Sequence, residues 1–246
     1  TTSTNNIRSQ LKTRIGDTLI NGEGLVELGK EDVKSVRVTL DTPHLYLKDF
    51  GFDSSPRTTE KADASAAQES TGLLSVLKEM APLFPVNVTV RIGGITGENS
   101  KIDSLLLQLI GTDNRYTLTE FSAKYNKALA EIRGVIDLNP ALPVMSLAGQ
   151  ANALPLGALL KDAGIDSNVS GALTVLGGIT VMGDTADVLL SNLNGSVAFA
   201  LENAVIEGAA YDLLATDLLA WIYSGALTEK STLLECTMAK FILQEG

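Results

Sequence analysis

The chain of 246 residues carries 19 Lys and Arg against 29 Asp and Glu, which gives a formal net charge of −10. This acidic balance argues against nucleic acid as a partner, because affinity for phosphates comes from clustered Lys and Arg. One His and one Cys exclude a thiolate zinc site and a multi-histidine metal centre. No cofactor is predicted, and only a metal bound by carboxylates alone stays open.

The chain is apolar for an acidic protein, with 45% hydrophobic residues and a mean hydropathy of +0.18. Such a composition indicates either a large core or a surface that stays apolar to contact a partner. The most apolar stretch, 213–227, is too short to span a membrane and contains Asp217. The polar residues 1–6 lack the apolar run of a signal peptide. Neither a membrane span nor a signal peptide is therefore predicted.

Apolar and polar residues alternate along much of the chain, which is typical of half-buried antiparallel strands. Parallel α/β sheets would instead show continuous apolar runs separated by long helices. The clearest alternating segments are 7–15, 36–40, 86–92, 136–138, 173–175, 179–181 and 197–201. We therefore predict a β-rich chain of about a dozen strands.

Two short segments predict tight connections between these strands. Thr112-Asp113-Asn114 lies between two apolar segments and is typical of a hairpin turn. Gly177-Gly178 separates two alternating segments in the same manner. Local connections of this kind predict a sheet that is largely a meander.

Four segments have the apolar spacing of short amphipathic helices. They are 70–82, 155–164, 184–193 and 210–224, with Pro155 expected at a first helical position and Gly164 as a C-terminal stop. Residues 53–70 contain nothing more apolar than alanine and proline, so we predict an exposed, flexible loop there. Because the alternation resumes on both sides of this loop, residues 1–246 are predicted to be a single β-rich domain.

A short pattern, apolar-x-Gly-x-apolar-x-apolar, occurs around Gly134, Gly171 and Gly195. Glycine inside a strand usually marks a bulge or a bend, so the pattern predicts kinks in a curved sheet. The intervals of 37 and then 24 residues between these glycines are unequal. A propeller or a β-helix would repeat at a nearly fixed period, and both architectures are therefore disfavoured.

The order of these motifs resembles the C-terminal region of the AsmA family. Residues 184–208 contain a short helix that ends in Leu-x-Gly, then a strand, then a turn that leads to Ile-x-Gly. Residues 234–246, a Cys-containing strand before an acidic-Gly turn, are similar to the same family, as are 116–138 and the helix start at Leu154. The resemblance extends over about 86–246.

This resemblance implies a bridge-like lipid-transfer protein of Gram-negative bacteria. Its expected fold is a long curved antiparallel sheet folded into an open apolar groove, with about four short amphipathic helices. The resemblance also implies a periplasmic fragment, anchored to the inner membrane in the full-length protein, that supports outer-membrane biogenesis by moving phospholipid. The expected partners are phospholipid acyl chains, the inner and outer membranes, and membrane or periplasmic proteins.

The candidate lipid-binding residues are apolar residues of the alternating segments, which share one face of their strands. For each of them, packing in an ordinary core stays as an alternative. They are Ile136, Leu138, Leu173, Val175, Val197, Phe199 and Leu201.

No catalytic site is predicted. His44 has no accompanying Gly-x-Ser-x-Gly motif and is interpreted as a surface or strand-edge residue, and Cys236 as a buried small hydrophobic residue. Residues 93–97 lack the Gly-Lys-Ser/Thr ending of a phosphate loop and are interpreted as a turn. Capping explains the carboxylates near the predicted helices, which are Asp162, Asp166, Asp184 and Asp187.

Three functions remain, in order of preference. The first is a non-enzymatic lipid conduit along the apolar groove. The second is a structural scaffold or assembly factor for outer-membrane proteins, in which another protein covers the apolar face and exposed sheet edges recruit strands. A carbohydrate-active enzyme is third, because 5% aromatic residues do not provide clustered rings for stacking on sugars.

Overall fold

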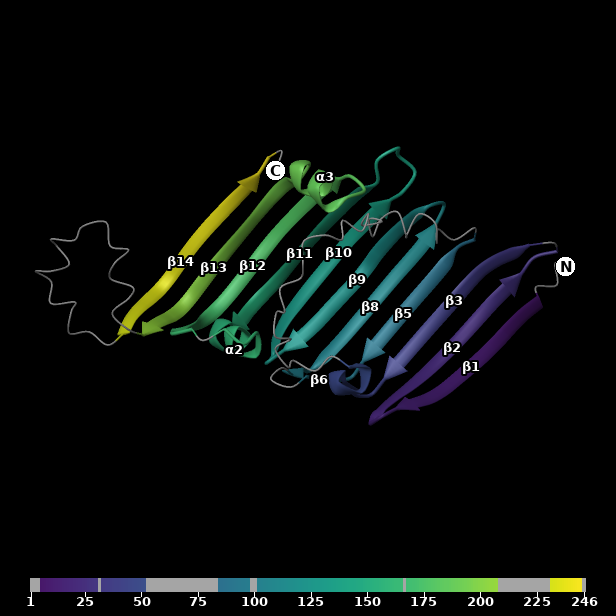
Figure 1. Cartoon of the computed structure of the whole chain (residues 1–246), viewed down its shortest axis with the longest axis horizontal. Coiled ribbons are helices and arrows are strands. Elements are labelled where there is room, and N and C mark those ends of the chain that lie inside the picture. Colours follow the sequence, from purple (N-terminus) through teal and green to yellow (C-terminus); the bar gives the residue numbers. More distant parts are fainter. Residues whose placement is uncertain are drawn as a thin grey trace, which may run out of the picture.

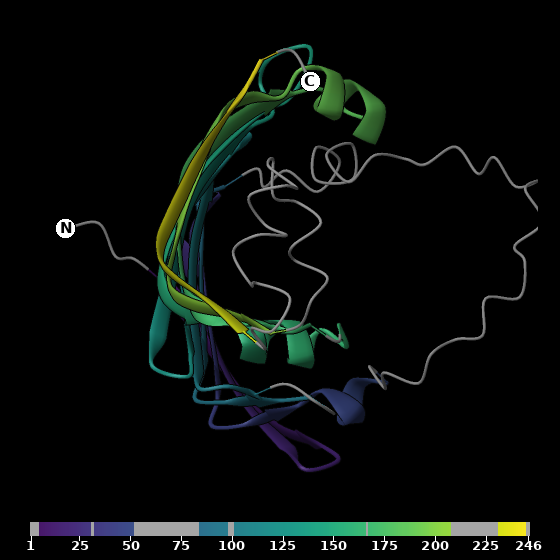
Figure 2. The same ribbon diagram turned by 90° about the vertical axis from the view of Figure 1, so that its left-hand side faces the viewer.

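A computed structural model of the chain describes residues 5–30, 32–51, 84–97, 101–165, 167–207 and 231–244. They form one sheet of eleven strands, a small sheet of three short strands, two α-helices and one 3-10 helix. The long strands lie side by side along the long axis (Figure 1). Figure 2 shows that the sheet bends into an arc that stays open on one side. No helix among the described residues is long and apolar enough to cross a membrane.

The eleven strands follow one another in space in their order along the chain. They are β1 (Asn5–Ile15), β2 (Thr18–Leu28), β3 (Val33–Thr42), β5 (Val86–Ile92), β8 (Ser104–Thr112), β9 (Arg115–Tyr125), β10 (Ala128–Asp137), β11 (Val144–Pro155), β12 (Val169–Met182), β13 (Asn194–Glu207) and β14 (Ser231–Leu243). The small sheet contains β4 (Leu45–Tyr46), β6 (Ile95–Thr96) and β7 (Lys101–Ile102), and the 3-10 helix η1 (Leu47–Phe50) follows β4. A mainly β chain with a meandering sheet is therefore confirmed.

One neighbouring pair departs from the antiparallel prediction. Strands β3 and β5 pair in parallel, with Val36 opposite Val86 and Thr42 opposite Ile92. A parallel pair needs a long crossover rather than a tight turn, and the chain between these strands runs from residue 43 to residue 85. All other neighbours in the large sheet are antiparallel.

Of the two predicted tight connections, one is confirmed and one is wrong. Asp113 and Asn114 link β8 to β9 with positive φ angles of 47° and 56°, as a two-residue hairpin turn requires. Gly177 and Gly178 instead lie in the middle of β12. The alternation keeps the same phase before and after these two glycines, because an insertion of two residues preserves a period of two. One continuous strand therefore explains both segments.

Two of the four predicted helices lie among the described residues. Helix α2 (Leu156–Asp162) begins one residue after the predicted first helical position, because Pro155 is its N-cap, and Gly164 follows with a φ of 72°. Helix α3 (Ala186–Ser191) is capped by Thr185, whose hydroxyl accepts a hydrogen bond from the Val188 N–H. The predicted helices at 70–82 and 210–224 lie outside the described residues, as do residues 53–70.

The predicted strand kinks coincide with irregular pairing. The β9–β10 register shifts between Ile132 and Gly134, and the β12–β13 register shifts between Ser170 and Ala172. Gly171, at the second shift, has a φ of 136°, which a side chain would strain. These bulges bend the sheet, since an extra residue on one strand increases local curvature and twist.

The contact between β9 and α2 identifies the concave face of the sheet. Tyr125 donates a hydrogen bond of 2.7 Å from its Oη to Oδ2 of Asp162, and α2 lies inside the arc, as α3 does at the opposite strand ends (Figure 2). Directly paired residues of neighbouring strands point to the same side. The register, followed outward from Tyr125, therefore assigns each strand residue either to the concave face or to the convex face.

Full burial of apolar side chains is confined to a few positions near strand ends. In the described part of the chain they are Tyr125, Ala128, Leu138, Val181 and Ala204. Residues in the middle of the sheet are mostly half-buried. The described strands thus make a single curved layer, with two short helices on its concave side.

Candidate functional site

An unbroken apolar row crosses the concave face from the first strand to the last. We call it the central row, and each member is directly paired with the next. Its members are Leu11, Gly22, Leu40, Val90, Leu107, Phe121, Ile132, Gly149, Gly177, Val197 and Phe241.

Three further rows run beside the central row. Toward α3, the first contains Ser9, Gly24, Val38, Val88, Leu109, Leu118, Gly134, Leu147, Ile179, Gly195 and Leu243. The next contains Ile7, Val26, Val36, Val86, Gly111, Tyr116, Ile136, Met145 and Val181. Toward α2, a row from β3 to β14 contains Thr42, Ile92, Leu105, Ala123, Ala130, Ala151, Val175, Phe199 and Ala239.

None of these four rows contains a charged residue. The charged residues that lie between these rows point to the convex face, where Arg91 lies 3.5 Å from Asp41 and Gln150 donates a hydrogen bond to Glu131. By the same alternation Glu235 of β14 lies on the concave side, beyond the four rows. The convex face also has apolar positions close to β14, of which Leu176 and Met238 are exposed. The two faces therefore differ chiefly in where the charge lies.

Six of the seven candidate residues lie on this concave face. Their strands bring them into direct pairs, with Leu173 opposite Leu201 and Val175 opposite Phe199. Phe199 also stacks on Phe241 of β14, with 5.4 Å between the ring centroids. The six are Ile136, Leu173, Val175, Val197, Phe199 and Leu201.

Leu138 is different from the other candidates. It follows the end of β10, its N–H donates a hydrogen bond to the carbonyl of Asn114, and it is only 1% exposed. Leu138 therefore packs as an ordinary core residue, because a side chain buried to this degree has no surface left for a ligand.

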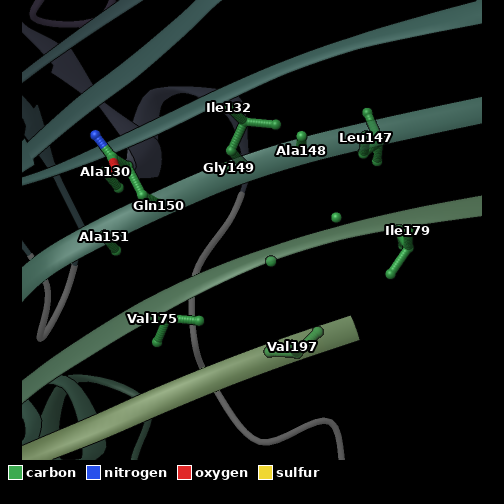
Figure 3. A pocket seen from close by; sticks show the side chains of 12 residues that line it. Ala130, Ile132, Leu147, Ala148, Gly149, Gln150, Ala151, Val175, Ile179 and Val197 are labelled. Atoms are coloured by element: carbon green, nitrogen blue, oxygen red, sulfur yellow. The ribbon is translucent and has the colours of Figure 1, made fainter. Parts of the chain in front are cut away.

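A shallow hollow of about 280 Å³ lies in the concave face over β10 to β13 (Figure 3). Its floor is formed where Gly149 of β11 pairs with Gly177 of β12. Branched aliphatic side chains surround this floor, and no charged residue lines the hollow. They are Ile132, Leu147, Val175, Ile179 and Val197.

Sequence reasoning missed the contribution of β11 to this hollow. Met145, Leu147, Gly149 and Ala151 lie on the concave face, but two of the four are too small to mark an apolar strand. The available signal was the period of two itself, because small residues at alternate positions still belong to the apolar face.

Polar contacts at the strand ends hold the surrounding elements in place. At the α2 end, burial and the hydrogen bond to Asp162 raise the pKa of Tyr125 to about 12. At the β1–β2 turn, Asp49 of η1 accepts hydrogen bonds from Asp17 N–H and from the N–H and hydroxyl of Thr18. Partial desolvation opposes ionisation of Asp49, but these bonds and nearby Lys48 keep its pKa below the usual value.

Two further groups have shifted pKa values. The hydrogen bond and charge of Asp17, 2.7 Å away, raise the pKa of Lys48, and desolvation raises the pKa of Tyr116. Both ion-pair partners Lys48 and Asp17 are more than half exposed, so water screens their attraction. These contacts attach η1 to the sheet and do not form a reactive centre.

The remaining sequence interpretations have mixed outcomes. His44 lies just before β4, with its Nε2 2.8 Å from the hydroxyl of Thr96. Of residues 93–97, the first two form the bend between β5 and β6, and 95–96 are β6 itself. The prediction for Cys236 is wrong: it is exposed, because it lies on the convex face of β14. The predicted capping role is also wrong for Asp162, which accepts a hydrogen bond from Tyr125. It is wrong for Asp184 as well, since Thr185 caps α3.

Asp187 does lie in the first turn of α3, and Asp166 lies outside the described residues. Among the described residues, no three His, Cys, Asp or Glu side chains gather in a way that would hold a metal ion.

Comparisons with protein-family models, with curated proteins and with solved structures found no match to this chain.

Proposed function

We propose that the concave face is an open apolar groove that binds lipid acyl chains, and that the protein carries phospholipid along it without chemical reaction. The observation that carries this proposal is the continuity of the four charge-free rows over the large sheet. A single charged side chain would interrupt an apolar path, and the sequence places none in these rows.

The driving force is the removal of acyl surface from water, which contributes about 0.8 kcal/mol for each buried methylene. The groove covers only one side of a bound chain, so the head group stays in water at the open side of the arc (Figure 2). A chain can then move across successive strands, because neighbouring rows offer similar aliphatic contacts. Transfer between the inner and outer membranes through the periplasm is the setting that the AsmA resemblance supports.

Native mass spectrometry of the purified chain tests this proposal. We expect phospholipid to be retained by the wild type and lost from the double variant Val197→Asp, Phe199→Lys, which keeps the circular dichroism of the wild type. Both residues are half-buried in the concave face, so their replacement leaves the hydrogen-bond ladder intact. Absence of bound lipid from wild-type protein incubated with phospholipid vesicles would overturn the proposal.

A scaffold or assembly factor for outer-membrane proteins is the second candidate. The exposed apolar side chains of β14 and Leu176 of β12 on the convex face favour it, because such patches often bind proteins. Photocrosslinking side chains at Val175 and at Leu176 separate the two functions. Labelling of phospholipid from Val175 supports lipid carriage, whereas labelling of protein from both positions supports a scaffold.

A further inference from the structure

Strand β14 is an edge of the large sheet with apolar side chains on both faces. Within the described residues it pairs with β13 alone and lies at one end of the row of strands (Figure 1). On the convex face Met238 and Ile242 are 76% and 66% exposed, and on the concave face Phe241 is 55% exposed. The strand contains no proline and its ladder with β13 is not interrupted by a register shift. An edge of this kind readily pairs with another strand.

The opposite edge, β1, has the features that discourage such pairing. Its concave residues include the exposed Ile7 and Leu11, but its convex residues include Arg8, Lys12 and Arg14. Charged residues on an edge strand, lysine above all, are a common protection against edge-to-edge association. The two edges therefore differ in the charge of their convex faces.

This difference in charge determines which edge strands of two copies can pair. Pairing of β1 with a second β1 would place the three cations of each copy on one face close together, which is unfavourable. Pairing of β14 with the β1 of another copy would set those cations beside Lys240 and the exposed Ile242. Pairing of β14 with a second β14 keeps those cations out of the contact and brings together the exposed apolar side chains that each copy carries on both faces of this strand.

We propose that β14 pairs with β14 of a second copy of this chain, antiparallel and about a two-fold axis perpendicular to the sheet. Such an axis keeps both concave faces on the same side, and it requires that paired residues share a face. Centred on Ala239, the pairing sets Ala239 against its own copy and Phe241 opposite Thr237. On the convex face it sets Ile242 opposite Cys236 and Met238 opposite the stem of Lys240. Neither Glu235 nor Lys240 then faces a like charge directly.

The pairing extends the concave face from eleven strands to a continuous sheet of twice that number. The row that ends at Ala239 continues into the same row of the second copy, and the central row, which ends at Phe241, continues into the row of Thr237 and Leu201. Because the contact is isologous it closes on itself and leaves the cationic β1 edges outside, so it produces a dimer rather than a filament.

A disulfide at the two-fold axis tests this arrangement. In the variant Ala239→Cys, Cys236→Ser, the two new thiols face each other across neighbouring strands, at a distance that a disulfide can bridge. We expect the oxidised variant to run as a covalent dimer. The matched variant Ser9→Cys, Cys236→Ser places its thiol on the concave face of β1 and should stay monomeric under the same conditions.

The mass of the unmodified protein in light scattering gives the second measurement. We expect twice the chain mass of 25.9 kDa for the wild type and for Ser9→Lys, and the single mass for Ala239→Lys, which opposes two ammonium groups at the axis. A monomeric wild type at about 100 µM, the low-affinity end for a specific contact, would overturn the proposal. So would crosslinking of the Ser9→Cys variant as efficient as that of Ala239→Cys.

A spin label on Cys236, the single cysteine of the chain, distinguishes the proposed pairing from a head-to-tail contact. The two labels lie about 20 Å apart in the pairing centred on Ala239, and about 50 Å apart when β14 meets β1, since strands repeat every 4.8 Å or so. A longer distance would overturn the two-fold arrangement. Lipid retention is measured separately, so failure of the dimer leaves the proposed lipid binding untouched.

Discussion

A charge placed in the central row should weaken lipid binding far more than the same charge on the neighbouring residue. Val197 and Ala198 are adjacent in β13 but face opposite sides, since Val197 pairs with Gly177 and Phe241 on the concave face. Ala198 pairs with Leu176 and Lys240 on the convex face. Val197→Asp and Ala198→Asp therefore add the same charge at the same point of the strand and form a matched pair.

The expected loss of binding free energy for Val197→Asp follows from the strand spacing. An acyl chain that crosses the strands places about four methylenes over each spacing of 4.8 Å, and a carboxylate that keeps its water excludes the chain from one strand. At about 0.8 kcal/mol per methylene, and with one side of the chain covered, the loss is about 1.5 kcal/mol, or roughly tenfold in affinity. We expect no more than a twofold change or so for Ala198→Asp, because it does not touch the chain.

Titration of a fluorescent fatty acid into each variant measures this difference, and urea unfolding of the apo proteins checks that both stay folded. Equal weakening by the two variants would mean that the charge acts through stability or overall charge rather than through contact. An unchanged affinity for Val197→Asp, with binding retained in the wild type, would place the acyl chain elsewhere on the molecule.

Three further predictions concern the contacts that shape the sheet. Tyr125→Phe removes the hydrogen bond to Asp162 and should lower the free energy of unfolding by about 1.5 kcal/mol in urea titrations. Because the pKa of Tyr125 is raised from 10.0 to about 12, the wild type should also lose stability as the pH rises through that interval. The variant should lose less stability over the same interval. Asp49→Asn removes a carboxylate whose pKa is lowered in the folded state, so the stability advantage of the wild type should be present above its ordinary pKa of 3.8 and shrink as the pH falls below it; an advantage that grows on acidification would contradict the assigned hydrogen bonds. Gly195→Ala places a Cβ against the Gly178 carbonyl at a φ of 151° and should cost about 1 to 3 kcal/mol in thermal or urea unfolding. Gly22→Ala, on the same face, should cost clearly less, because its Cβ meets a side-chain methyl of Leu40 at 3.3 Å rather than backbone, and Gly22 has no positive φ.

The period of two was sufficient to predict the class of fold and the sharing of one face by six candidate residues. It worked for Val175 and Val197 because a strand in a single-layer sheet has one apolar face, and a register error of one residue would reverse every side chain. The turn predicted at Gly177-Gly178 rests on the absence of large side chains and is wrong, because the phase of the alternation does not change there. The phase is therefore better evidence for a continuous strand than the absence of a large side chain.

Burial was harder to predict than pairing. The alternation around Leu138 and around Val175 is the same in the sequence, yet Leu138 is 1% exposed and Val175 is half-buried. The difference comes from position along the strand, since turns and helices cover the strand ends and the described residues leave the middle as a single layer. For Cys236 the error is the opposite one: burial is predicted and the residue is exposed. An apolar pattern does not show that a strand lies at the edge of its sheet.

The curvature of the sheet arises at a few irregular positions, where the chain inserts an extra residue and the apolar face continues beyond it. An uninterrupted alternation would give a regular twisted strand, and a bulge is what turns such a strand toward its own face. The register shifts beside Gly134 and Gly171 supply that bend in β9 to β13, and the phase of the apolar residues is restored on both sides of each shift, so that Leu118 and Phe121 both pair into concave rows. Thr119 is the extra residue of the β9 bulge, since Glu120 pairs with Gln108 and Leu118 with Leu109. Deleting Thr119 should therefore straighten β9 without moving any side chain to the other face, because Leu118, Glu120 and Phe121 then alternate regularly. Curvature and the charge-free surface are consequently separable properties of the sequence: the extra residues at the bulges bend the sheet, and the alternation on either side of them keeps charge off its concave face.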